Sequence, residues 1–182
     1  ILDANPDWTT TTVAVGAWAE DPFILPGAEY TVKDLWTAAL VASSNRSILS
    51  LANFVTPSST EFAALLNAKA AALGMHNTSL VEPSGLSANN RSTAADVALL
   101  VAEAARHPEI TEATQLREFT IAPAGRAVRE VGKHMWNTDW LALGWVPHEF
   151  SAIQVGKTGY IPEAGYNFAI QVANADGSAL QV

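Results

Sequence analysis

The chain has 182 residues, 49% hydrophobic and 15% charged, a composition typical of one globular unit with a sizeable core. Its ten basic and 18 acidic residues give a formal net charge of −8, which opposes the phosphate attraction behind most nucleic-acid binding. It has no cysteine, which excludes disulfides and thiolate metal sites, and no apolar run of the roughly 18–20 residues that cross a bilayer. We therefore expect no nucleic-acid partner and no membrane segment in this sequence.

Residues 8–15 are rich in β-forming side chains and should be extended, and three capping boxes then mark helix starts. The boxes are Thr31 with Asp34, Ser58 with Glu61, and Thr93 with Asp96. In each pair a hydroxyl accepts from an otherwise unpaired amide, so each pair predicts a helix. Gly74 should end the second of these helices in a left-handed conformation. The third should run from Ala94 to Arg106 and stop before Pro108.

A polar break, Ser43-Ser44-Asn45, interrupts the first helix and separates it from a helical run through residues 48–52. The buried face before the break should consist of Leu35, Trp36, Ala39, Leu40 and Ala42. Polar residues are therefore expected at the turn of an apolar helical hairpin.

From Arg117 the sequence changes to strand-like patterns. Residues 118–121 alternate, and residues 127–131 should pair back on them as a hairpin. Further strands are expected at 153–160, at 166–173 and, after a turn at 174–177, from 179 onward. Helices at about 31–115 and antiparallel strands at about 116–182 predict an α+β, or layered α/β, fold. We expect one partial domain over residues 1–182, incomplete at both ends.

The aromatic and histidine residues predict packing rather than metal binding. Trp136, Trp140 and Trp145 lie within ten residues and are expected to be buried groups that cover a surface loop. The four histidines lie in separate segments, without a His-Glu-x-x-His run. Since cysteine is also absent, we predict no metal site and no cofactor.

The motif Lys157-Thr158-Gly159 follows an apolar lead-in and should lie on a strand. A cation, a hydroxyl donor and an unobstructed backbone, next to one another on an extended edge, suit an anionic substrate lying along that strand. The tripeptide alone is weak evidence, because by itself it is more often a solvent-facing strand end. Its significance depends on the earlier Ser43-Ser44-Asn45 motif.

Together, these two motifs resemble two of the three signatures of the active-site serine penicillin-binding proteins and β-lactamases. The surrounding segments resemble, more narrowly, the low-molecular-mass serine D-alanyl-D-alanine carboxypeptidases of the peptidase S11 type. These segments are, in chain order, residues 26–35, 73–78, 83–86, 92–96, 137–138, 156–160 and 164–165. The resemblance extends over about residues 26–173 and implies the β-lactamase/transpeptidase-like fold, with a helical part and an antiparallel sheet.

The resemblance also implies roles for six residues. They are Ser43, Asn45 and Lys157 as catalytic residues, and Thr158, Gly159 and Tyr160 as substrate-binding residues. Ser43 would relay protons, and Asn45 would bind a backbone amide of the substrate. Lys157 would supply positive potential for the terminal carboxylate, to which Thr158 would donate a hydrogen bond. The Tyr160 amide would be one donor of the oxyanion hole.

The third signature, the Ser-x-x-Lys that carries the nucleophile in this family, is missing. The chain's lysines are Lys33, Lys69, Lys133 and Lys157, and the residues three positions before them are Tyr30, Leu66, Glu130 and Gln154. We therefore expect the chain to begin just after that motif and to be inactive alone. Loss of the nucleophile-bearing helix should leave an apolar face uncovered, which a missing N-terminal segment would fill.

By this resemblance the protein cleaves D-Ala-D-Ala stem peptides through an acyl-serine, outside the cytoplasm, although the chain carries no signal peptide. Its partners would be the peptidoglycan pentapeptide and β-lactam antibiotics. Two alternatives remain: a non-catalytic peptidoglycan-binding relative, or a β-lactamase in which Glu82 would serve as base. Where the family often has Asp-Ala, this chain has Arg46-Ser47. Arg46 would assist carboxylate binding or face solvent, and we favour solvent.

Overall fold

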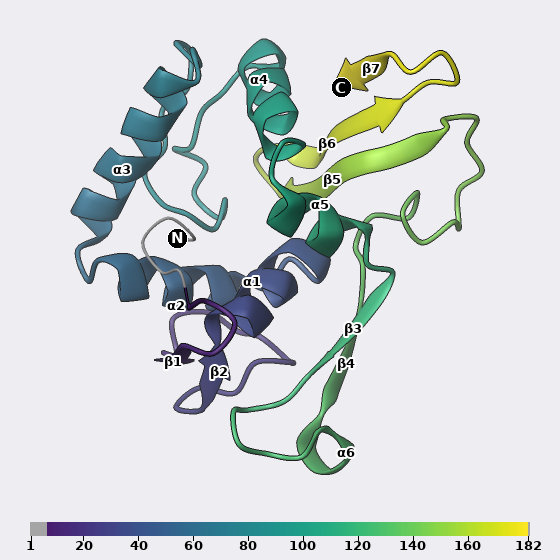
Figure 1. Cartoon of the computed structure of the whole chain (residues 1–182). Helices are drawn as coiled ribbons and strands as arrows, with labels where there is room; N and C mark the ends of the chain where they lie inside the picture. The colour runs from purple at the N-terminus through teal and green to yellow at the C-terminus, as the bar shows by residue number, and fades with distance from the viewer. Residues whose placement is uncertain (1–6, 182) are drawn as a thin grey trace.

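The computed structural model describes residues 7–181, which form helices and antiparallel strands. The helices are α1 (Val32–Val41), α2 (Asn45–Val55), α3 (Ser59–Ala72), α4 (Ala94–Ala104), α5 (Pro108–Gln115) and the short α6 (Val128–Val131). The strands are β1 (Thr12–Ala14), β2 (Glu29–Thr31), β3 (Glu118–Ile121), β4 (Lys133–Trp136), β5 (Ala152–Ile161), β6 (Gly165–Ala173) and β7 (Ala179–Gln181). The predicted α+β class is confirmed. Figure 1 shows the helices α1–α5 on one side and the β5–β6–β7 sheet on the other.

The three capping boxes begin helices as predicted. The Thr31 hydroxyl accepts from the Asp34 amide at 3.0 Å, and Ser58 and Thr93 accept from Glu61 and Asp96 at 3.2 Å each. Gly74 follows α3 with a φ of 80°, the left-handed conformation expected of it. Local hydrogen bonds of hydroxyl side chains therefore determine where these helices start.

The core lies where α1 packs on the β1–β2 ribbon and on the β3–β4 hairpin. Its most buried members include Val13, Ile24, Tyr30, Val32, Leu35, Ala38, Leu51, Ile121 and Met135. Of the predicted buried face of α1, only Leu35 is fully buried, because the core-facing line runs through Val32, Leu35, Ala38 and Val41. The Trp36 side chain lies at the edge of this face, where its indole Nε1 donates to the Glu109 carbonyl at 3.2 Å.

Three strand and helix assignments differ from the sequence-based expectation. Residues 127–131 do not pair with β3; residues 128–131 form α6, and β4 pairs instead, in the register Phe119 with Met135. The sequence does not predict a helix at 108–115, because proline commonly ends a helix; Pro108 instead begins α5, where proline's missing N–H costs nothing. Of residues 8–15 only 12–14 form a strand, since amides of the preceding turn donate to the Asp7 carbonyl.

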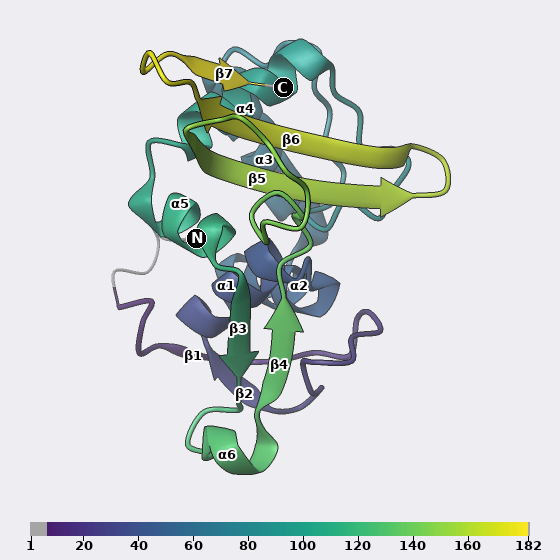
Figure 2. The same ribbon diagram turned by 90° about the vertical axis from the view of Figure 1, so that its right-hand side faces the viewer.

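The sheet is the part of the fold that carries the Lys157 motif. β5 and β6 pair antiparallel, with Lys157 opposite Ala169, Thr158 opposite Phe168 and Tyr160 opposite Tyr166. Helices α4 and α5 cover one face of this sheet, α5 against β5 and α4 against β6. Turned by 90°, the molecule shows the other face of the sheet toward the viewer, and the β3–β4 hairpin with α6 at its far end (Figure 2).

The expectation that the three tryptophans are buried is wrong. Trp136, Trp140 and Trp145 are 50%, 61% and 59% exposed. Their rings contact one another in a row, with centroids 6.1 Å apart between Trp136 and Trp145 and 6.3 Å apart between Trp140 and Trp145. Sequence alone could not identify this, because a cluster of large aromatic residues is more often part of a core than of a surface.

The expectation that Arg46 faces solvent is also wrong. Its side chain is 8% exposed and donates hydrogen bonds to the backbone carbonyls of Ala19, Asp21 and Ile24. The Asp21 carboxylate in turn accepts from the Ser44 hydroxyl at 2.5 Å. Arg46 therefore fixes the loop before β2 against the start of α2, directly beside the Ser43-Ser44-Asn45 motif.

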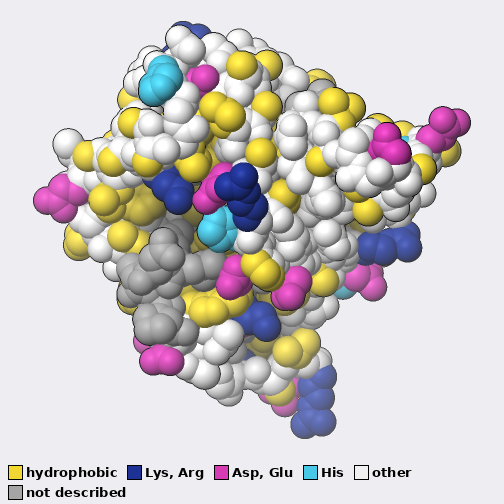
Figure 3. Space-filling view, turned by 45° about the horizontal axis from the view of Figure 1, so that its top comes forward, with side chains coloured by type: hydrophobic (Ala, Val, Ile, Leu, Met, Phe, Trp, Pro, Cys, Tyr) yellow, Lys and Arg dark blue, Asp and Glu magenta, His cyan; other side chains and the backbone are white. Residues whose placement is uncertain are grey.

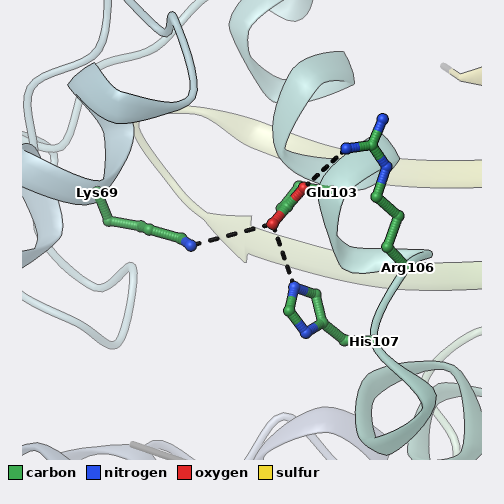
Figure 4. Close-up of polar contacts among 4 residues, drawn as sticks. All are labelled: Lys69, Glu103, Arg106 and His107. Carbon is green, nitrogen blue, oxygen red and sulfur yellow. Dashed lines mark hydrogen bonds and ion pairs between the residues drawn. The ribbon is translucent and has the colours of Figure 1, made fainter. Parts of the chain in front are cut away.

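A surface cluster joins α3 to the C-terminal end of α4 (Figure 4). The Glu103 carboxylate lies 3.2 Å from His107 Nε2, 3.4 Å from Arg106 Nη1 and 4.0 Å from Lys69 Nζ. The hydrogen bond from His107 holds the pKa of Glu103 below its usual value. Because Lys69 and Arg106 are exposed, we expect this cluster to contribute little to stability.

The face seen in Figure 3 carries scattered hydrophobic side chains around a few charged and histidine side chains. Among the residues described, no helix combines the length and the hydropathy that crossing a bilayer requires.

Arg46→Met should lower the free energy of unfolding by roughly 2–4 kcal/mol, because buried carbonyl acceptors would lose their charged donor. Urea denaturation measures this change. The matched control is Arg129→Met on exposed α6, for which we expect a change within about 0.5 kcal/mol. Equal effects of the two substitutions would show that Arg46 has no anchoring role.

Candidate functional site

The turn between α1 and α2 and the strand β5 meet through one hydrogen bond. Lys157 Nζ donates to Ser43 Oγ at 2.7 Å, across 114 positions of sequence. It also donates to the backbone carbonyl of Thr158 at 2.7 Å, which curls the lysine side chain against its own strand. The two motifs predicted from the sequence are therefore in direct contact.

Burial lowers the pKa of the Lys157 amine from its usual 10.5 to about 8. Removing an ammonium group from water disfavours its charged form, and burial is the cause of this shift. Among the described residues no carboxylate pairs with Lys157. An anionic ligand near this amine would supply the missing counter-charge.

Ser43 has an unusual backbone conformation, with a φ of 56°. It is the one residue other than glycine with a positive φ in the part of the chain that the structure describes. The chain leaves α1 at Ala42 and must reverse at once, since the Ser44 amide donates back to the Ala38 carbonyl. Such a conformation costs a serine of order 1–3 kcal/mol, and strain of this kind concentrates at functional sites.

The start of α2 positions the third residue of this motif. Ser44 caps the helix by accepting from the Ser47 amide at 3.1 Å, and Asn45 is the first helical residue. Asn45 is half-buried, and within residues 7–181 its side-chain amide has no hydrogen-bond partner. It lines a cavity of about 430 Å³ together with Ser43 and Lys157. The amide is therefore available to a ligand in that cavity.

The residues after Lys157 form the other wall. Thr158 Oγ1 donates to Thr138 Oγ1 at 2.6 Å. A Cβ placed on Gly159 would meet no atom within 4 Å, so packing within the chain does not demand a glycine there. Its open backbone leaves room for a ligand to lie close to the strand. The Tyr160 side chain is 57% exposed and lies beside Tyr166, with ring centroids 4.7 Å apart.

All six residues predicted from the sequence line the cavity of about 430 Å³. They are Ser43, Asn45, Lys157, Thr158, Gly159 and Tyr160. Four of them, all except Asn45 and Lys157, also line a second cavity of about 720 Å³. The two cavities therefore meet at Ser43 and the Thr158–Tyr160 segment, where they form a groove along the edge of the sheet.

Sequence reasoning did not identify the residues that build the larger cavity. These are Thr138, Asp139, Trp140, Leu141, Tyr166 and Phe168. Residues 137–138 were noted only within the family resemblance, and the cross-strand register that brings Phe168 beside Thr158 is not readable from one sequence. Asp139 is 1% exposed, and its Oδ1 accepts from the Leu141 amide at 2.8 Å. Its Oδ2 is buried without a partner among the described residues.

Glu82 serves as a loop anchor. Its carboxylate accepts from the Ser84 amide at 2.6 Å, the Ser84 hydroxyl at 2.5 Å, the Ser87 amide at 3.1 Å and Asn90 Nδ2 at 2.8 Å. Burial alone would raise the pKa of Glu82, but the hydrogen bonds from Ser84 and Ser87 outweigh it and lower the pKa. A carboxylate held in this way is a poor general base.

An apolar groove lies behind Lys157, between the sheet and the helices α1, α4 and α5. Its volume is about 770 Å³, and its lining includes Leu40, Val97, Leu100, Val101 and Ile110. Leu100 is 45% exposed there. Lys157, Thr158 and Gly159 belong to the same lining.

Ser43→Gly should be more stable than Ser43→Ala by about 1 kcal/mol, because both remove the hydroxyl but only glycine accepts a positive φ without strain. Thermal or urea denaturation of the matched pair measures the difference. Equal stability would mean that the backbone at residue 43 relaxes to an ordinary conformation.

Comparison with known proteins places this geometry in a family. The model of peptidase S11, described as D-alanyl-D-alanine carboxypeptidase, matches residues 8–182. A D-alanyl-D-alanine endopeptidase of Pseudomonas aeruginosa is 33% identical over 144 residues, which are 77% of this chain and 43% of that protein. A D-alanyl-D-alanine carboxypeptidase of Bacillus subtilis is 31% identical over 163 residues, 88% of this chain and 39% of that protein. The chain spans less than half the length of these two relatives.

Solved structures show the same fold. A D-alanyl-D-alanine carboxypeptidase from Mycobacterium tuberculosis is similar with a TM-score of 0.77 and 26% identity, over 94% of this chain and 65% of that one. Penicillin-binding protein D2 from Listeria monocytogenes, in its ampicillin-bound form, has a TM-score of 0.75 and 25% identity, over 98% and 70% of the two chains. The predicted β-lactamase/transpeptidase-like fold is therefore confirmed, and the chain belongs to the peptidase S11 family of D-alanyl-D-alanine carboxypeptidases.

Proposed function

We propose that this chain is the substrate-aligning part of a serine D-alanyl-D-alanine peptidase that acts on peptidoglycan stem peptides through an acyl-serine. The hydrogen bond from Lys157 to Ser43 is the observation that carries the proposal. It joins the two motifs into one groove wall, next to the open backbone of Gly159. The family match over residues 8–182 supports the same reaction class.

Each side chain of the groove has a chemical task in this proposal. Ser43 passes a proton between the nucleophile and the leaving amine, because its hydroxyl both accepts from Lys157 and can donate. The Asn45 amide binds the backbone of the substrate. Lys157 provides positive potential, and the Tyr160 amide stabilises the oxyanion, a contribution worth roughly 2.7–4 kcal/mol per donor. Thr158 aligns the substrate beside the open backbone of Gly159.

The nucleophile, in a Ser-x-x-Lys segment upstream of residue 1, belongs to the proposal as well. The apolar groove of about 770 Å³ behind Lys157 supports it, since a helix with an apolar face would fill this space. A helix in this groove would set its polar side toward Ser43 and Lys157. Without that segment the chain has no group to form the acyl intermediate and is inactive.

The wider setting of the protein follows from the same proposal. Residues 1–182 form part of one transpeptidase-like domain, which works outside the cytoplasm where peptidoglycan lies. Its partners are stem peptides and β-lactams, a view supported by the ampicillin-bound form of the similar Listeria protein. The relatives include both an endopeptidase and a carboxypeptidase, which both act at a D-alanyl carbonyl.

The β-lactamase alternative has little support, because the hydrogen bonds to Glu82 occupy its carboxylate. A binding relative without a nucleophile would share the groove, and a covalent label separates it from the enzyme.

The protein that includes the upstream segment should form a covalent adduct with fluorescent penicillin. Lys157→Met should reduce the rate of adduct formation at least about tenfold, because a charged contact to the ligand is lost. Gel fluorescence and intact mass measure the adduct. Exposed Lys133→Met, on β4, is the matched control. No adduct in the unsubstituted protein would support the binding relative and end the proposal for an enzyme.

The acylation rate should fall as the pH rises through about 8, because the pKa of Lys157 is lowered to that value and the neutral amine attracts the anionic ligand less. Stopped-flow acylation by penicillin between pH 6 and 10 measures the profile. Lys157→Arg keeps its charge over this range, so its profile should lose the fall near pH 8. A fall that persists in Lys157→Arg would have to come from another group.

A further inference from the structure

Thr138 is a groove residue to which the roles proposed above give no task. It lines the cavity of about 720 Å³ together with Ser43 and Thr158. It lies in the segment that follows β4, whereas Thr158 lies on β5. The hydroxyl oxygens of Thr138 and Thr158 are 2.6 Å apart, near the short end of the range of roughly 2.5–3.0 Å for such pairs. A firm hydrogen bond therefore joins Thr138 to a residue that aligns the substrate.

The backbone around Thr138 is held in place. The Thr138 amide donates to the carbonyl of Val41, the last residue of α1, at 3.0 Å. The preceding side chain, Asn137, is 4% exposed and donates to the carbonyls of Thr114 and Leu116 at 2.9 and 2.7 Å. Since a β-branched side chain on a fixed backbone has few rotamers, Thr138 presents its hydroxyl from a defined position.

The number of protons limits what this pair of hydroxyls can do. Each threonine hydroxyl has one proton, and its oxygen can also accept. In the structure Thr158 donates its proton to Thr138. Thr158 cannot donate the same proton to a substrate carboxylate as long as this arrangement lasts. If Thr158 simply turned away, the hydrogen bond between the two residues would be lost.

A reversal of the hydrogen bond avoids this loss. Among the described residues, Thr138 Oγ1 bonds to Thr158 alone, so its own proton can turn toward Thr158 without breaking another contact in that part of the chain. Thr158 then accepts from Thr138 and has its own proton free to donate. The number of hydrogen bonds between the two residues stays the same.

Lys157 does not compete for the Thr158 hydroxyl. Its Nζ donates to Ser43 Oγ and to the backbone carbonyl of Thr158. Thr158 Oγ1 is therefore left to bond with Thr138. A carboxylate that is attracted by the charge of Lys157 reaches the Thr158 hydroxyl on the neighbouring residue.

We propose that Thr138 is a positioning residue, which turns its proton to Thr158 when an anionic ligand binds and so frees the Thr158 proton for the ligand carboxylate. This inference rests on the proposed function, in which the substrate lies along β5. No covalent bond changes, because each hydroxyl keeps its own proton and only the two O–H groups rotate. Hydrogen bonds that follow one another in this way strengthen each other by polarisation, and an ionised acceptor makes the last bond stronger still.

The test measures acylation of the protein with its upstream segment by benzylpenicillin and by the methyl ester of benzylpenicillin. The penicillin carboxylate stands in for the terminal carboxylate of the peptide, and the ester replaces its charge with a neutral group. Thr138→Val removes the hydroxyl but keeps the branched shape. The second-order acylation rate constant should fall by about fivefold to tenfold for benzylpenicillin, and by about twofold or less for the ester. An equal loss for both ligands, or no loss for benzylpenicillin, would overturn the inference.

Two further variants separate the hydroxyl from the shape of the side chain. Thr138→Ser keeps the hydroxyl and removes the methyl group, so both rate constants should stay within about twofold of the unsubstituted protein. A loss in Thr138→Ser as large as in Thr138→Val would contradict the inference. Urea denaturation shows whether each variant is folded, and Thr138→Ala provides a second variant without the hydroxyl if Thr138→Val is not.

A double-mutant cycle shows whether Thr138 acts through Thr158. Thr158→Val alone should slow acylation by benzylpenicillin, because the donor itself is lost. Adding Thr138→Val should then cause little further loss, since Thr138 has no proton to free in that variant. Independent, additive losses would mean that Thr138 contacts the ligand directly and would disprove the positioning role.

The unsubstituted protein keeps this inference distinguishable from the proposed function. If benzylpenicillin acylates it and Thr138→Val has no selective effect, the proposed function stands and the inference is disproved. If benzylpenicillin does not acylate it, the function is disproved, together with the inference that rests on it.

Discussion

The contact between Lys157 Nζ and Ser43 Oγ is the constraint on which the site depends. It holds a strand of the sheet against the turn of a helical hairpin, and each partner is prepared by its surroundings. On the helical side, Arg46 binds loop carbonyls and Asp21 accepts from Ser44, so the turn has little freedom to move. On the strand side, the Thr158 hydroxyl is bonded to Thr138. The groove is therefore formed by elements that are fixed before any ligand arrives.

This arrangement also concentrates unfavourable free energy at one place. Ser43 is held at a positive φ, and Lys157 is half-buried, with its pKa lowered by desolvation and without a carboxylate partner among the described residues. A buried cation without a partner is costly for a fold but useful for a site, because a bound anion recovers part of the lost solvation. Backbone strain at Ser43 and desolvation of Lys157 thus occur together at this site, whereas the core around Leu35 and Tyr30 consists of apolar side chains. Such local conflicts are expected at functional positions.

The sequence predicted the features that depend on local chemistry. Capping boxes located the starts of three helices, and the order of two short motifs indicated the groove. Features that depend on distant contacts were missed. Arg46 is buried because carbonyls 22–27 residues away converge on it. The tryptophans lie at the end of β4 and in the segment that follows it, and all three are at least half exposed. Pro108 was ambiguous in principle, since proline both ends helices and begins them.

Gly156 restricts the register in which β5 can pair at the site. A Cβ at this position would lie 2.2 Å from Asp139 Oδ2, so only a glycine can stand opposite that carboxylate. If β5 slipped by one residue, Val155 or Lys157 would bring its side chain to the same point and collide with a loop that Asp139 itself holds closed. Steric overlap therefore disfavours shifted pairings of β5 with β6, and Lys157 reaches Ser43 in one register only.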